Sequence, residues 1–164
     1  MTMATDNMKK TIGSIVTALL LLIVLASTVF AAGEKEFLLK GSLDTTETQQ
    51  VVFPTAFINL TGTGTGTHLG LFTYNLQAQL NLPTLSATGL ATLVAADGST
   101  LFLEGTGQGT LTSVPGVVSI VETFTITGGT GRFEGASGNV TVERLVNRAT
   151  LTSSGTISGT IILP

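Results

Sequence analysis

Apolar and polar residues alternate along much of the chain, and the alternation is clearest between residues 117 and 147. Even-numbered positions over 118–126 are mostly apolar and the odd-numbered ones mostly hydroxylic, and the same pattern returns over 140–146. A period of two is typical of a half-buried β-strand. A glycine-rich segment, 128–138, separates the two runs. The pattern therefore predicts a β-hairpin over 117–147.

Two charged residues interrupt the apolar faces of this hairpin. Glu122 and Arg144 each take a position that the period assigns to the apolar side. If the connection is centred on Phe133, positions whose numbers sum to 266 face each other, and these two residues satisfy that sum. They would then form a charged or proton-sharing pair that holds the polar end of a ligand. The alternatives are a structural cross-strand ion pair, or one side chain turned to solvent by a register slip.

The rest of the chain divides into further extended runs separated by turn residues. We expect a first strand over 37–44 and a polar turn or loop over 44–48. Pro54 marks a strand edge, a bulge or a strand break, and an extended run resumes over 57–60. A Thr-Gly repeat over 61–66 predicts a glycine-lined barrel corner. Further strands are expected over 72–80, 85–96, 100–111, 149–151 and 155–163, with turns at Asp97-Gly98 and 114–116.

About eight strands without a helical period predict an all-β fold. Strands of this number must close or stack to avoid exposed edges. We therefore predict an eight-stranded antiparallel β-barrel, with a β-sandwich as the alternative.

The first 31 residues are typical of a secretory signal peptide that forms a signal helix. Lys9 and Lys10 precede an apolar run over 12–30, and small residues follow it at Ala31. We expect cleavage after Ala31, leaving one domain over 32–164 that is secreted or periplasmic and not attached to a membrane. The alternative is an uncleaved N-terminal membrane anchor.

Composition excludes several classes of function. Residues 32–164 carry five basic and nine acidic side chains, a net charge of −4, and few aromatics, so nucleic acid is not an expected partner. The chain has no cysteine and a single histidine, His68, so neither a structural zinc site nor any other metal site is expected. No residue set indicates a cofactor. His68 is expected to be a polar turn residue.

Two stretches, 66–73 and 125–138, resemble a group of exported bacterial proteins that share the allene oxide cyclase and dirigent type of β-barrel. The second stretch contains Gly-Gly-Thr-Gly-x-Phe-x-x-Ala-x-Gly, which is similar to a motif of plant dirigent proteins. The resemblance implies an eight-stranded barrel whose apolar interior holds a small hydrophobic molecule. It also implies a homo-oligomer as an expectation, because the plant relatives form trimers. Neither the cyclase's carboxylate and water-binding set nor the dirigent cavity acids match residues of this chain.

Several other side chains are candidates for the wall of such a cavity. Tyr74 and Glu104 share strand faces with Phe72 and Phe102, and Phe124 shares the face of Glu122. A buried tyrosine needs only a hydrogen-bond partner, and phenylalanines are more commonly core residues.

Three functions are consistent with these features. The first is non-catalytic binding of a small hydrophobic molecule, or an extracellular structural role. The second is an isomerase or cyclase that acts by steric confinement, and the third is a ligand-free surface scaffold. An interior void of about 300 Å³ or more beside Glu122 or Tyr74 would favour binding or catalysis, whereas a filled interior would exclude both.

Overall fold

The structure of the protein is a computed structural model that describes residues 33–164. It contains eight strands and one short 3₁₀ helix, η1 (Gly131–Phe133). The strands are β1 (Lys35–Val52), β2 (Thr55–Gly66), β3 (Gly70–Asn81), β4 (Ser86–Ala95), β5 (Thr100–Leu111), β6 (Val117–Gly129), β7 (Ser137–Asn147) and β8 (Thr152–Leu163).

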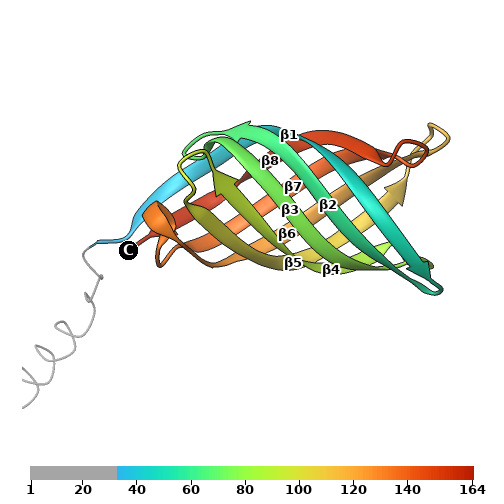
Figure 1. The fold of residues 1–164 in the computed structure, drawn as a ribbon, viewed down its shortest axis with the longest axis horizontal. Helices are drawn as coiled ribbons and strands as arrows, with labels where there is room; N and C mark the ends of the chain where they lie inside the picture. Colours follow the sequence, from blue (N-terminus) through green and yellow to red (C-terminus); the bar gives the residue numbers. More distant parts are fainter. Residues whose placement is uncertain (1–32) are drawn as a thin grey trace, which may run out of the picture. The chain divides into compact units, whose positions relative to one another are not determined.

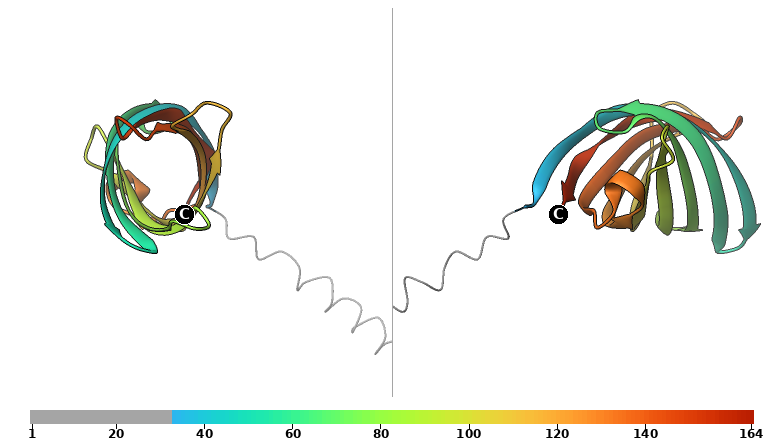
Figure 2. Two further views of the ribbon diagram at one scale, coloured as in Figure 1. Left: turned by 90° about the vertical axis from the view of Figure 1, so that its right-hand side faces the viewer. Right: turned by 60° about the vertical axis from the view of Figure 1, so that its left-hand side comes forward.

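Each strand pairs antiparallel with the next, and β8 pairs with β1 to close the sheet (Figures 1 and 2). The fold is thus the predicted eight-stranded antiparallel barrel rather than the alternative sandwich. Closure pairs every strand on both sides, so no strand edge is left open to solvent. No helix among residues 33–164 is long and apolar enough to cross a membrane.

The interior is filled mainly by inward-facing apolar side chains. Leu39, Leu60, Leu93, Leu101, Val140 and Ile157 are all at most 1% exposed. At the end of the barrel that holds η1, Leu69, Phe133 and Ala136 are also buried and belong to this core. Apolar side chains therefore close this end, which lies on the left in Figure 1.

Glycines of β2 make room for a large side chain of β3. Gly64 pairs with Phe72, and a Cβ placed on Gly64 would lie 2.5 Å from Cζ of Phe72. Because glycine has no side chain, the ring can lie against the backbone of β2. The Thr-Gly repeat, for which a glycine-lined barrel corner was predicted, lies within the continuous strand β2.

The predicted turn over 44–48 is wrong. These residues continue β1, which runs unbroken for 18 residues. Thr45 and Glu47 point into the barrel and are buried, whereas Asp44, Thr46 and Thr48 point outward. Polar residues fill both faces here, so the local pattern resembled a turn. The predicted strand over 149–151 is also wrong, because those residues form the turn before β8.

The predicted hairpin over 117–147 is present as β6 and β7, but its register differs from the prediction by two residues. Glu122 pairs with Val142, and Arg144 pairs with Ile120. The connection includes η1 and is centred one residue before Phe133. A shift of two leaves every side chain on the same face, so Glu122 and Arg144 still share the interior as diagonal neighbours.

The predicted signal segment, 1–31, lies outside the described residues.

Candidate functional site

Three charged side chains meet inside the barrel toward the end opposite η1. Arg144 on β7 donates from Nε to Oε2 of Glu122 at 3.2 Å and from Nη2 to Oε1 at 2.9 Å. Its Nη1 lies 3.6 Å from Oε2 of Glu47 on β1. All three residues are at most 6% exposed. We call Glu47, Glu122 and Arg144 the charged cluster.

Hydroxyl groups from β8 and β1 complete the surroundings of Arg144. Its Nη1 donates to Oγ of Ser153 at 3.2 Å, and the Ser153 hydroxyl shares a hydrogen bond with Thr45. Residues from β1, β6 and β8 therefore converge on one guanidinium of β7. A fork of donors matched to a carboxylate is the geometry in which arginine binds most strongly.

Two carboxylates against one guanidinium leave the charged cluster with an excess of negative charge. Burial disfavours the charged form of Arg144, but the hydrogen bonds to Glu122 and the charges of Glu122 and Glu47 outweigh burial and raise its pKa above the usual value. Arg144 is therefore held as a cation, with Glu122 as its bidentate partner.

Tyr74 lies on β3 beside Glu122 and is fully buried. Its hydroxyl has no hydrogen-bond partner among the described residues. Burial raises the pKa of Tyr74 well above its usual value, and the negative charge of Glu122 raises it further. Tyr74 is thus held as a neutral phenol beside the carboxylate of Glu122.

A cavity of about 90 Å³ lies at the end of the barrel that holds the charged cluster. This end is on the right in Figure 1 and faces the reader in the left view of Figure 2. Its walls are mainly aliphatic, and Glu47, Glu122 and Arg144 supply charged groups to its lining. The aliphatic lining includes Leu76, Leu80, Leu85, Val118, Ile120 and Val146. The volume is below the void of about 300 Å³ that would favour a binding or catalytic site, so that expectation is not met. The interior is nevertheless not completely filled at this end of the barrel.

The structure brings together only part of the predicted cavity wall. Glu122 and Arg144 line the cavity, with Tyr74 buried beside them. Phe72 and Phe124 face inward, but they belong to the packed core and do not line this cavity.

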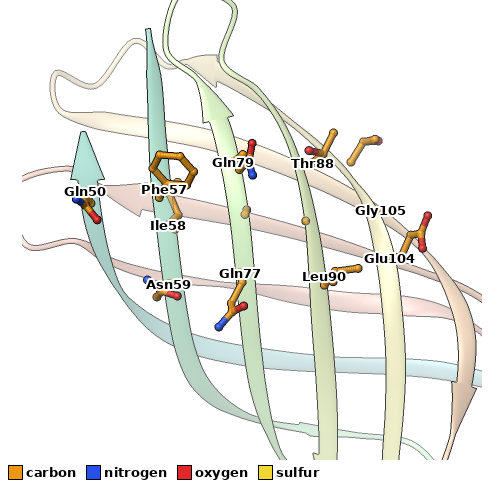
Figure 3. A pocket seen from close by; sticks show the side chains of 13 residues that line it. Gln50, Phe57, Ile58, Asn59, Gln77, Gln79, Thr88, Leu90, Glu104 and Gly105 are labelled. Atoms are coloured by element: carbon orange, nitrogen blue, oxygen red, sulfur yellow. The ribbon is translucent and has the colours of Figure 1, made fainter. Parts of the chain in front are cut away.

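Glu104 and Phe102 lie outside the barrel, so their predicted interior position is wrong. Phe102 is 42% exposed, and Glu104 is one of the residues that line a groove on the outer face of β2 to β5 (Figure 3). Leu101 and Leu103 take the interior positions on β5 instead. Three consecutive apolar residues, 101–103, made the inward face of this strand ambiguous in the sequence.

Sequence reasoning missed Glu47. Its carboxylate accepts a hydrogen bond from Nε2 of Gln49 at 2.6 Å through Oε1, whereas Oε2 is buried without a hydrogen-bond partner. A signal did exist, because Leu43, Thr45 and Glu47 continue the alternation of Leu39.

Among residues 33–164, no cluster of three or more potential metal-ligating side chains is present.

At the opposite end, His68 lies in the turn between β2 and β3, as expected. Its φ of 63° is in the left-handed region, and its ring packs against Phe37 with 5.0 Å between centroids. The histidine is exposed and lies at the end of the barrel opposite the charged cluster.

Comparison with solved structures identifies dirigent proteins as similar in fold. The pterocarpan synthase dirigent protein GePTS1 superposes with a TM-score of 0.55 at 16% identity, covering 80% of this chain and 86% of that one. The pterocarpan synthase dirigent protein PsPTS1 gives a TM-score of 0.52 at 14% identity, covering 77% and 94%. No protein-family model and no curated protein matches the chain in sequence. The likeness therefore concerns the fold.

Proposed function

We propose that this protein is an exported barrel that binds a small apolar molecule without transforming it. The observation that carries the proposal is the cavity, which combines aliphatic walls with a buried charged cluster. Aliphatic walls bind the apolar part of a ligand, and a few buried polar groups orient its polar end. The ligand's remaining part extends through the mouth of the barrel, because the cavity is too small to enclose a whole molecule.

Export is the second part of the proposal and rests on the sequence. The basic, apolar and small-residue regions of 1–31 are those of a signal peptide. The chain has no cysteine, so its folding does not depend on disulfide formation, and the barrel would fold in a reducing or an oxidising compartment.

An isomerase or cyclase is the second candidate. The two similar structures are named as pterocarpan synthases, and Tyr74 offers an unpartnered hydroxyl beside Glu122. Catalysis by confinement requires the substrate to be enclosed and folded on itself. A cavity of about 90 Å³ holds only one end of such a substrate, so we place binding first.

Native mass spectrometry of the protein purified from its source tests the proposal. We expect a retained small molecule in the wild type. Ala87→Leu would fill the cavity, because Ala87 lies on its wall, and should abolish retention while the barrel still folds. Thr88→Leu is the matched control, since Thr88 is exposed on the outer face of the same strand. Equal retention by the two variants would contradict the proposed site.

A further inference from the structure

We infer that the polar end of the ligand is a cationic hydrogen-bond donor, an amine in its ammonium form, bound by Glu47. The inference rests on the proposed function and specifies the class of ligand for the same cavity. Its basis is the unequal use of the hydrogen-bonding groups in the charged cluster.

Arg144 is already engaged by its neighbours. Its Nε and Nη2 donate to Glu122, and Nη1 donates to Ser153 and lies beside Glu47. A carboxylate or phosphate on a ligand would have to displace one of these partners. It would also place a third negative charge beside Glu47 and Glu122, which is strongly unfavourable in a buried site. An anionic ligand end is therefore disfavoured.

Glu47, in contrast, has an unused acceptor. Gln49 takes one of its carboxylate oxygens, whereas Oε2 has no hydrogen-bond partner and lies 3.6 Å from Arg144. Glu47 is 6% exposed, and it lines the cavity. A buried acceptor without a donor is costly, and a ligand that supplies the donor removes this cost.

Charge distinguishes an ammonium from a neutral hydroxyl. The buried cluster has two carboxylates and one guanidinium, and the other charged residue on the cavity lining, Arg148, is exposed at the rim. A hydroxyl would satisfy Oε2 of Glu47 but leave the excess negative charge in place. An ammonium does both, through a charge-assisted hydrogen bond, which is roughly twice as strong as a neutral one.

Isothermal titration calorimetry of the full chain with three six-carbon compounds tests this inference. Hexylamine, hexan-1-ol and hexanoate share one apolar tail and differ in the charge of the polar end. We expect the dissociation constant of hexylamine to be at least about ten-fold lower than that of hexan-1-ol, and hexanoate to bind most weakly. In Glu47→Gln, the ratio of amine to alcohol affinity should fall to about one.

Glu143→Gln is the matched control, because Glu143 is exposed on the outer face of β7 and its substitution changes the net charge equally. This variant should keep the preference for the amine. Equal or tighter binding of hexan-1-ol by the wild type would overturn the inference and leave the proposed function intact. The same preference in both variants would also overturn it. Binding of none of the three compounds would overturn the proposed function itself. If Glu47→Gln does not fold, the order of the three affinities in the wild type decides.

Discussion

Arg144 is the residue on which the interior charges of the barrel depend. It is the sole basic residue of the charged cluster, and it contacts two carboxylates that are both buried. Removing one partner of a buried ion pair costs more than the pair contributes, because the remaining charge stays out of water. Removing Arg144 would leave two such charges.

We predict that Arg144→Met lowers the free energy of unfolding by about 3–5 kcal/mol at neutral pH. Guanidinium chloride denaturation followed by circular dichroism measures this change. The control is Arg148→Met, which removes a charge of the same sign from the exposed rim of the cavity. Its free energy of unfolding should stay within about 0.5 kcal/mol of the wild-type value. Similar small effects in both variants would show that the cluster does not stabilise the fold.

Tyr74 predicts a loss of stability at alkaline pH. Its pKa is raised in the folded protein by burial and by Glu122, whereas in the unfolded chain it titrates near 10. Above that pH the unfolded state binds fewer protons than the folded state, so the free energy of unfolding should fall by up to about 1.4 kcal/mol per pH unit.

The measurement is clean because Tyr74 is the only tyrosine and the chain has no tryptophan. Absorbance of tyrosinate should therefore develop only as the protein unfolds. Tyr74→Phe should lose this component of the pH dependence, and the difference between the two proteins isolates it. A tyrosinate signal near pH 10 in the folded protein would show that the hydroxyl reaches water.

Among the elements, β2 and β3 pack together because a glycine on β2 faces a large side chain on β3. Gly64 faces Phe72 so closely that a methyl group has no room. At Gly66 the nearest atom to an added Cβ would be Cδ1 of Leu39, at 3.2 Å, and the other contacts, at 3.5 Å, are ordinary van der Waals distances. A Cβ at Gly64 would also meet the backbone oxygen of Ser42 on β1, which cannot move independently of the sheet.

Gly64→Ala should therefore destabilise the protein by about 1–3 kcal/mol, as overpacked sites do. Gly66→Ala, two residues further along the same strand, should lower the free energy of unfolding by clearly less, because the flexible end of the Leu39 side chain can shift. Thermal unfolding of the two variants compares the sites directly. If Gly66→Ala were the more damaging substitution, the assigned packing of Phe72 would be incorrect.

The alternation of residue types was sufficient to predict most strands, because inward-facing positions are apolar wherever the interior is packed. It failed at β1 because Thr45 and Glu47 point into the barrel. Their partners Arg144 and Ser153 come from β7 and β8, so the alternation that runs through Leu39 and Leu43 continues at these two positions with polar residues in place of apolar ones. The register of β6 and β7 was missed by two because η1 makes the connection asymmetric, which glycine content alone does not reveal.

At the scale of the whole barrel, the two ends differ in chemistry. Phe133, Leu69 and Ala136 close one end with apolar packing, and the other end holds the charged cluster and the cavity. Closure of the sheet was predicted ahead of a stacked sandwich, because closure protects the edges of all eight strands. The size and position of the cavity depend on how side chains from all eight strands fill one interior, and no single stretch of sequence determines that.

The central claim is that a small apolar molecule binds inside the barrel at the end opposite η1. Methyl chemical shifts of the full chain, recorded by NMR during titration with hexylamine, test it most directly. We predict shifts confined to methyl groups of the cavity wall, such as Leu85, Val118 and Val146, with none at the exposed Leu38 or Leu145. Shifts confined to the exposed leucines, or no shifts at all, would contradict the account.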